Sequence, residues 1–150
     1  MKNIVIGTIF GLLLFNSCTV TPPPYVQTEY GFEVNAETAS TIISSKILHK
    51  DVTYEDELSK LCDGLSNVTA LELVTEDDLR FIAEVSLDGV SDKRKKEILG
   101  EFDALFSYYG NVVSKCECSV EESNIIIQSM ADGISKVLEV YWVTSSDELF

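Results

Sequence analysis

A stripe of large apolar residues between positions 98 and 116 limits most strongly what this chain can fold into. Its members are separated alternately by four and three residues, the spacing that places side chains on one face of an α-helix. Leu99, Phe106 and Val113 lie beside the stripe and widen it. A helix with such a wide apolar face needs neighbours to cover it, so we expect it to be the central helix of the core. The stripe consists of Ile98, Phe102, Leu105, Tyr109, Val112 and Cys116.

Further helices are predicted where a capping residue precedes an apolar stripe. Asn35 would begin a helix that ends near Lys50, and Ser91 or Asp92 would begin the central helix. Elsewhere a threonine or serine stands three residues before an acidic residue, the pattern of a capping box, in which both side chains accept hydrogen bonds from backbone N–H groups. Three such pairs predict helix starts. They are Thr53 with Asp56, Thr75 with Asp78, and Ser119 with Glu122.

Residues 26–34 alternate between apolar and polar side chains, the pattern of a strand with one buried face. A single strand needs a partner, so this segment would be either a short N-terminal strand or an extended arm lying across helices. Segments 68–74 and 79–87 also permit an interpretation as two strands, which would give an α+β fold. Because the capping signals and the helical stripes agree, we predict a mainly α fold, a small bundle of about four to five helices with that short N-terminal strand or arm. The α+β fold stays open as the alternative.

The first 17 residues have the three parts of a secretory signal. Lys2 supplies positive charge, a largely apolar run of 12 residues follows at Ile4–Phe15, and the small residue Ser17 precedes Cys18. The apolar run is shorter than the roughly 20 residues that a membrane-spanning helix needs. We therefore predict that residues 1–17 are a signal peptide, removed after export.

The order Leu14, Phe15, Asn16, Ser17, Cys18 resembles the lipobox of bacterial lipoproteins. In that class the cysteine thiol receives a diacylglyceryl group before the signal is cleaved, so the resemblance implies that Cys18 is the lipid attachment site. It also implies a place in the cell envelope. By similarity to enterobacterial lipoproteins, a non-acidic residue directly after the cysteine implies the outer membrane, with the protein facing the periplasm or the cell surface. Two alternatives stay open, namely ordinary cleavage that leaves a free cysteine, and an uncleaved membrane anchor.

The residues after Cys18 fit a spacer between the lipid and a folded domain. Pro22, Pro23 and Pro24 exclude a helix and favour the extended polyproline conformation, which rises about 3.1 Å per residue. We therefore interpret residues 18–25 as a lipidated, proline-rich tether, although a merely disordered terminus remains an alternative. Residues 26–150 are then enough for a single domain with its own core.

The charge of this domain is strongly acidic. Loss of residues 1–17 would remove one cation, Lys2, and leave 10 basic and 25 acidic residues, a net charge of −15. Such a surface repels nucleic acid phosphates and anionic lipid head groups, so no nucleic acid partner is expected. The 45% apolar content is too high for a disordered acidic tail, and the chain should fold.

Three cysteines remain beyond Cys18, at Cys62, Cys116 and Cys118. In an oxidising compartment two of them could pair, and the short separation of the last two favours a disulfide from Cys62 to either Cys116 or Cys118. A metal site is not expected, because the chain has one histidine and no second pair of closely spaced cysteines.

The sequence gives no candidate catalytic constellation, and we predict that the protein is not an enzyme and needs no cofactor. The single histidine, His49, lies at the polar end of the first helix, where the helix dipole favours it. The acidic groups 55–57, 76–78 and 121–122 resemble paired catalytic acids or calcium ligands at first. Each falls in the first turn of a predicted helix, where negative charge is stabilising, so a structural reason suffices.

Four basic residues stand together before the central apolar stripe. Cations at a helix start are unfavourable, so helix stability does not explain them. They form either a binding patch for an acidic partner or a solvated corner that pairs with nearby carboxylates. They are Lys93, Arg94, Lys95 and Lys96.

Together these features predict a lipid-anchored envelope protein whose acidic helical domain binds another protein, as an assembly, scaffold or accessory factor. Two alternatives remain. One is a periplasmic inhibitor or exclusion factor that binds a cationic target, which the net charge favours. The other is a pilotin-like secretion accessory, by analogy of fold only.

Overall fold

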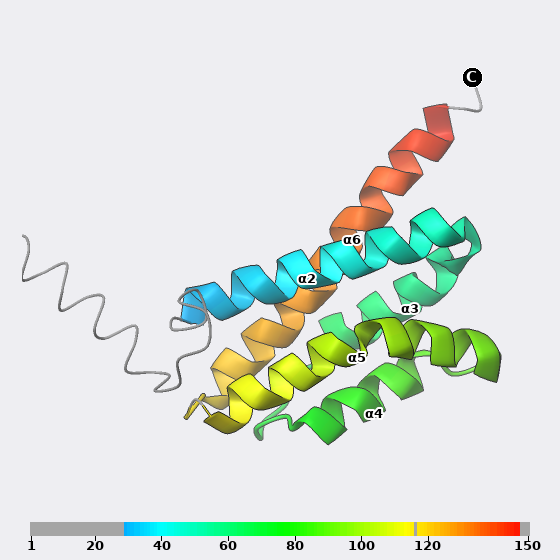
Figure 1. The fold of residues 1–150 in the computed structure, drawn as a ribbon. Coiled ribbons are helices and arrows are strands. Elements are labelled where there is room, and N and C mark those ends of the chain that lie inside the picture. Colours follow the sequence, from blue (N-terminus) through cyan, green and yellow to red (C-terminus); the bar gives the residue numbers. More distant parts are fainter. Residues whose placement is uncertain (1–28, 116, 148–150) are drawn as a thin grey trace, which may run out of the picture.

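The computed structural model describes the backbone of residues 29–115 and 117–147, and the side chains of residues 35–115 and 117–142. Over these residues the chain forms five α-helices and one 3-10 turn, which confirms the predicted mainly α bundle (Figure 1). The elements are α2 (Glu29–Lys50), η2 (Val52–Tyr54), α3 (Glu55–Ser66), α4 (Glu76–Ser86), α5 (Asp92–Lys115) and α6 (Val120–Asp147).

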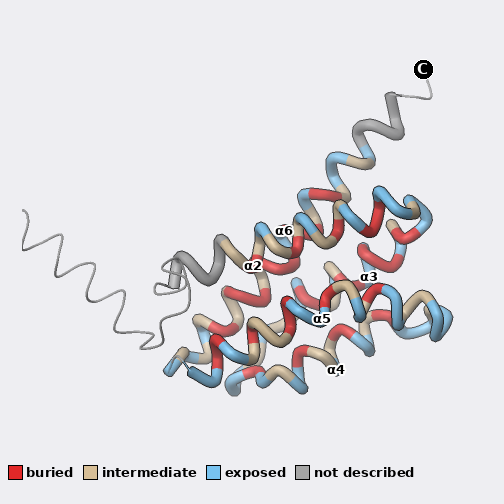
Figure 2. Tube along the Cα trace, in the orientation of Figure 1, coloured by how far each residue is buried: buried red, intermediate tan, exposed pale blue. Residues whose placement is uncertain are grey.

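Helix α5 buries the described members of its predicted apolar stripe, but it packs mainly against α4 and α2, whereas α6 packs along both α2 and α3, so α5 is not the single central helix that the stripe predicts. Phe102, Phe106 and Tyr109 are among the largest fully buried side chains, and the two phenylalanine rings stack with their centroids 5.9 Å apart. Figure 2 shows the buried residues of every helix turned toward the interior that α5 shares with its neighbours. The buried hydroxyl of Tyr109 donates a 2.7 Å hydrogen bond to the carbonyl oxygen of Val74, and this bond fixes the segment before α4 against α5.

Helices α2 and α6 pack against each other through small residues. Gly133 of α6 lies so close to α2 that an added Cβ atom would be 1.9 Å from Ser40 Oγ and 2.3 Å from the carbonyl oxygen of Glu37. Thr41 donates a hydrogen bond from its hydroxyl to the Gly133 carbonyl at 3.3 Å, and Ser40 is fully buried. The absence of a side chain at Gly133 therefore sets how closely the two helices approach.

Two of the three predicted capping boxes are present. Thr75 and Asp78 form one at the start of α4, and Ser119 and Glu122 exchange the equivalent hydrogen bonds at the start of α6. The prediction for Thr53 was wrong. Thr53 lies inside η2 and donates its backbone N–H to the carboxylate of Asp51, which caps this turn and places α3 one residue later.

The predicted strand over residues 26–34 was also wrong where the structure describes it. Residues 29–34 belong to α2, which continues through Asn35 instead of starting there, while residues 26–28 lie outside the described range. A helix satisfies its backbone hydrogen bonds within the segment, whereas a strand here would need a partner that none of the described segments provides.

The α+β alternative is also wrong, because neither of the two segments that could be strands forms one. Residues 79–86 belong to α4, residues 68–74 form an irregular connection, and no strand occurs among the described residues. Gln128 of α6 holds the start of this connection, since its side-chain amide donates hydrogen bonds to the carbonyl oxygens of Leu65, Ser66 and Val68.

Candidate functional site

The basic run at residues 93–96 lies in the first turns of α5, but its members face different ways. Arg94 turns inward and donates a 2.7 Å hydrogen bond to the carbonyl oxygen of Thr53. Its guanidinium lies 3.9 Å from the ring centroid of Tyr54, a cation–π contact, and pairs with the carboxylate of Glu57. Arg94 therefore holds α5 against the start of α3, and it is not part of an open binding patch.

The electrostatics of this contact follow from burial and pairing. Glu57 is only 9% exposed, and its pKa lies below the usual value because Arg94 donates a hydrogen bond to it, which outweighs the effect of burial. The pKa of Arg94 is raised in turn by Glu57. Both groups stay charged at neutral pH, so the pair is a structural link between helices.

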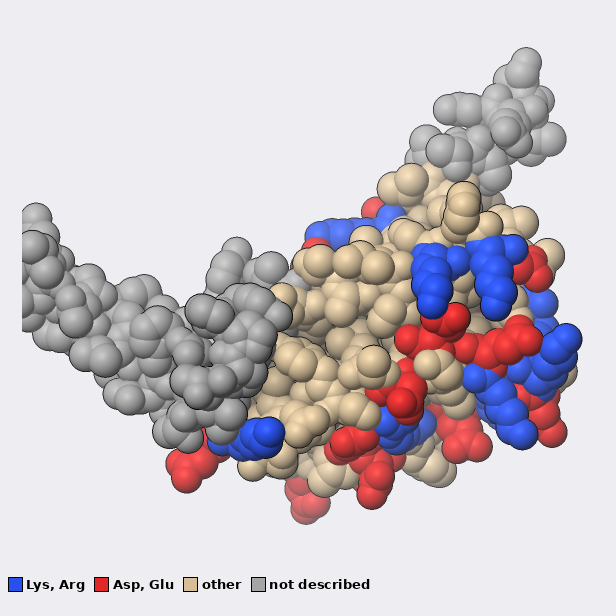
Figure 3. All heavy atoms as spheres, viewed as in Figure 1, with Lys and Arg blue, Asp and Glu red and all other residues tan. Residues whose placement is uncertain are grey.

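Lys93 and Lys96 are exposed and Lys95 is partly buried, and none of the three forms an ion pair within the described part of the chain. Figure 3 shows basic side chains gathered at one end of the bundle, with acidic side chains between them. A mixed surface of this kind has a weak net field. Its role as a binding patch stays a prediction.

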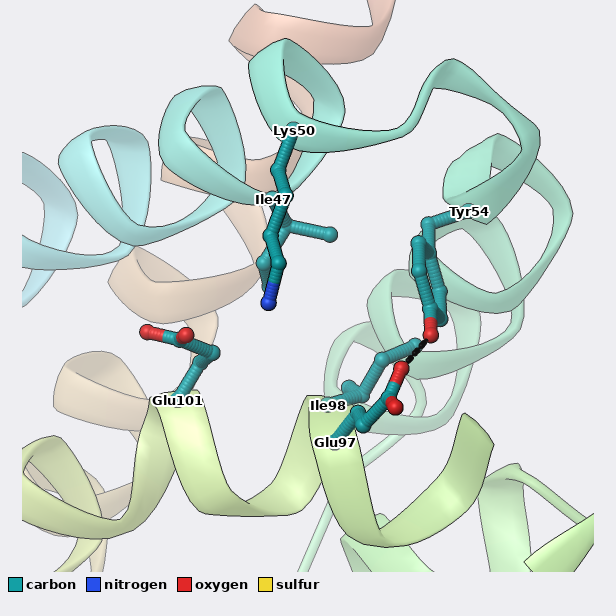
Figure 4. Close-up of a pocket in the computed structure, with 6 residues that line it drawn as sticks. All are labelled: Ile47, Lys50, Tyr54, Glu97, Ile98 and Glu101. Carbon is teal, nitrogen blue, oxygen red and sulfur yellow. Dashed lines mark hydrogen bonds between the residues drawn. The ribbon is translucent and has the colours of Figure 1, made fainter. Parts of the chain in front are cut away.

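A small cavity lies between the end of α2 and the start of α5. Its volume is about 90 Å³, which is well below the size of a typical organic ligand site. The hydroxyl of Tyr54 donates a hydrogen bond to Glu97 across one side, and Lys50 extends over the opening toward Glu101 (Figure 4). Its lining residues are Ile47, Lys50, Tyr54, Glu97, Ile98 and Glu101.

The cysteines occupy different parts of the bundle. Cys62 lies on α3, where its Sγ donates a hydrogen bond to the carbonyl oxygen of Ala131 at 3.4 Å, and burial raises the pKa of this thiol. Ala131 lies 11 residues beyond Val120, the first residue of α6, and so about 16 Å along the helix from the end next to Cys118, whereas disulfide-bonded residues have Cα atoms about 4.4 to 6.8 Å apart. Cys62 and Cys118 are accordingly not bonded to each other, which corrects that pairing. The pairing with Cys116 falls outside the described residues.

The acidic groups lie where the sequence predicts them. Residues 55–57, 76–78 and 121–122 occupy the first turns of α3, α4 and α6. His49 is exposed in the last turn of α2. Within residues 35–115 and 117–142 no group of three or more histidine, cysteine, aspartate or glutamate side chains is placed to hold a metal ion.

Two larger hollows lie on the surface of α5. One, of about 280 Å³, is a mainly apolar groove between α2 and α5. The other, of about 410 Å³, lies between the start of α4 and the end of α5, and is both apolar and acidic. The second hollow is lined by Leu73, Thr75, Glu76, Asp77, Gly110, Asn111, Val113 and Ser114.

The outer face of α4 is a feature that the sequence analysis missed. Phe81 and Val85 are large apolar residues there, yet they are 67% and 54% exposed, while Leu79 and Ala83 of the same helix are fully buried. The signal was present in the sequence, since Phe81 and Val85 fall outside the apolar stripe of a helix that starts after Thr75. We call this surface the acidic α4 face. It consists of Asp77, Asp78, Phe81, Glu84, Val85 and Asp88, all exposed.

Comparisons with known proteins give no relative. No family model, no curated protein and no solved structure matches the chain at a significant level. Among the described helices, none has the length and apolar character that crossing a bilayer requires. The predicted signal peptide, Cys18 and the proline-rich tether lie outside the described residues.

Proposed function

We propose that this chain is a lipid-anchored protein of the bacterial cell envelope, and that its helical domain acts by binding another protein rather than by catalysis. The observation that carries the proposal is the placement of Ser17 and Cys18 one residue after the end of the apolar run Ile4–Phe15. A thiol at the end of a short export signal is the substrate for lipid attachment. The three prolines that follow would keep the bundle away from the membrane surface.

Exposed apolar side chains on a preformed bundle support the protein-binding part of the proposal. Single exposed apolar residues are normal on a soluble surface, but adjacent ones mark interaction sites more often. Here they are concentrated on α4, in the connection before α4 and near the end of α6. The large exposed residues in these places are Leu71, Leu73, Phe81, Val85, Val140 and Trp142.

Metabolic labelling with radioactive palmitate tests the anchor. We expect the wild-type chain to incorporate label and the Cys18→Ser variant to lose it entirely, because the diacylglyceryl group is transferred to the thiol of that cysteine before the signal is cleaved. Cys62→Ser is the matched control and should keep full labelling. A wild-type chain without label, or a Cys18→Ser variant that retains it, would contradict the proposal.

Crosslinking in intact cells tests the second part of the proposal, that the domain binds another protein. A membrane-bound partner should give a discrete adduct with the wild-type protein and less adduct with Cys18→Ser at equal expression, because anchoring raises the local concentration of the domain. An absence of any discrete adduct at several crosslinker positions on α4 and α6 would contradict partner binding.

A further inference from the structure

The acidic α4 face follows one side of α4 and the turn after it. Successive residues of an α-helix turn by about 100°, so residues 77, 81 and 84 lie along one line, with 78 and 85 beside it, while Asp88 lies in the turn that follows the helix. The buried residues Leu79, Ala83 and Leu87 lie on the opposite side and attach α4 to the bundle. Figure 1 places α4 at the periphery, packed on α5 and α3, so its outer face is open to a partner.

Two apolar anchors lie together at the middle of this face. Phe81 and Val85 are four residues apart on α4, a separation at which helical side chains are neighbours. Their burial in the bundle is excluded by the orientation of the helix, because Leu79 and Ala83 already occupy the core side. An aromatic residue beside an aliphatic one is typical of the centre of a protein interface.

Carboxylates surround the anchors, and the six described residues that define the acidic α4 face include no cation. Asp77, Asp78, Glu84 and Asp88 carry four negative charges on the same face. The one basic residue of α4, Arg80, points away and donates hydrogen bonds to Glu76 and Asp103. Figure 3 shows acidic side chains along the lower edge of the molecule, where α4 lies, with basic side chains between some of them.

The hollow beside the start of α4 extends this surface. Asp77 belongs both to the acidic α4 face and to the lining of the 410 Å³ hollow, whose other walls include Leu73 and Val113. A long aliphatic side chain with a terminal cation fits such a hollow, because its stem contacts apolar walls while its charge reaches Asp77.

The negative charge of the acidic α4 face decides which kind of partner can bind there. A second copy of this chain would place four carboxylates against four others, and an anionic membrane or a nucleic acid would be repelled in the same way. A segment that combines lysine or arginine with apolar residues matches both the anchors and the charge. We propose that the acidic α4 face binds an amphipathic, lysine- and arginine-rich segment of a partner protein. This inference rests on the proposed protein-binding function and names the chemistry of the partner.

Binding of a synthetic peptide to the purified full-length protein tests the inference. The probe is a fluorescently labelled helical peptide with leucine at i, i+3 and i+4 positions and lysine or arginine elsewhere, measured by anisotropy. We expect saturable binding that weakens with salt, and about a tenfold or greater loss for Phe81→Ser with Val85→Ser, because the anchors lose their buried area. Asp77→Asn with Glu84→Gln and Asp88→Asn should weaken binding and reduce its salt dependence.

Matched controls distinguish binding by the acidic α4 face from nonspecific binding by the net charge or the exposed apolar surface of the whole protein. Ile42→Ser removes an apolar residue of α2 that is 63% exposed, and Asp63→Asn with Glu117→Gln and Glu121→Gln removes three exposed acids elsewhere. Neither control should change binding by more than about twofold. Circular dichroism should show all variants folded, since every altered side chain is exposed.

Several outcomes would overturn the inference. They are no saturable binding, equal loss in the controls, equal binding of a scrambled peptide of the same composition, dimerisation through α4, or binding to phosphatidylglycerol vesicles that the α4 variants abolish. Failure of palmitate labelling would remove the anchor without touching this result. Failure of peptide binding would leave the anchor intact, so the two proposals fail separately.

Discussion

At the scale of single residues, the contact between Arg94 and Glu57 is the most informative. Of the ion pairs between described residues it has the least exposed acid, with 12% of the Glu57 side chain accessible. Exposed pairs contribute up to about 1 kcal/mol, whereas removal of one partner from a buried pair costs more because the other is left unpaired. Arg94, which the sequence places in a possible binding patch, therefore contributes to the stability of the fold.

The pH dependence of stability tests this assignment. The pKa of Glu57 in the folded protein lies below its unfolded value of 4.5, so its contribution is present above pH 4.5 and is lost as the pH falls through the folded pKa. We expect Glu57→Gln to lower the free energy of unfolding by about 1–3 kcal/mol at pH 7, and by progressively less below pH 4.5. Urea unfolding of both proteins at several pH values measures the difference.

The neighbouring Lys93 provides the control for this experiment. It is exposed on the same turn, and Lys93→Gln should change the free energy of unfolding by no more than about 0.5 kcal/mol at any of these pH values. A difference between wild type and Glu57→Gln that stays constant from pH 7 to pH 3 would contradict the role given to the ion pair.

At the scale of elements, the spacing between helices depends on glycine residues at the points of contact. Gly133 lets α6 approach α2, and Gly64 of α3 plays the same part toward α4, since a Cβ atom there would lie 1.7 Å from Ser86 Oγ. Glycine weakens a helix by about 1 kcal/mol relative to alanine, and the close packing of the two helices offsets this cost.

Two glycine-to-alanine substitutions separate helix propensity from packing. Gly133→Ala should lower the free energy of unfolding by about 1–3 kcal/mol, because its Cβ meets the backbone of Glu37. Gly100→Ala in α5 has nothing within 4 Å and should raise the free energy of unfolding by about 0.4–1 kcal/mol. Denaturant titration measures both, and a stabilising Gly133→Ala would show that the helices do not touch as described.

Helix caps can be predicted from the sequence, whereas contacts between distant helices cannot. The boxes at Thr75 and Ser119 use residues within four positions of each other, so the sequence shows them directly. The approach of Gly133 to Ser40 joins residues 93 positions apart, and no local pattern indicates it. The start of α2 was mistaken for a strand because a period of two over few residues does not reveal whether a partner strand exists. The apolar stripe of the helix after Thr75 leaves Phe81 and Val85 outside it, but only the packed bundle shows that no neighbouring helix covers these two side chains.

At the scale of the whole molecule, the excess of acidic residues opposes the compact state. The chain has 25 acidic and 11 basic residues, and five ion pairs are found between described residues, so many carboxylates repel one another across the surface. Repulsion between exposed charges is screened within about 8 Å at physiological ionic strength, which makes stability sensitive to salt.

Thermal unfolding in sodium chloride tests this balance. The melting temperature should rise between about 10 mM and 200 mM salt, because screening weakens repulsion more than it weakens the few exposed ion pairs. The variant Asp77→Asn with Glu84→Gln and Asp88→Asn carries three fewer negative charges and should show a smaller rise. A melting temperature that falls with salt would mean that ion pairs outweigh repulsion.

The packing of α2 on α6 joins the first and last of the described helices. A ribosome makes α2 early, but its main partner does not exist until residues 120–147 have been synthesised. Contacts between such distant segments are slow to form and come late in folding. Until the last helix emerges, the nascent chain therefore cannot cover the face of α2 that α6 packs against.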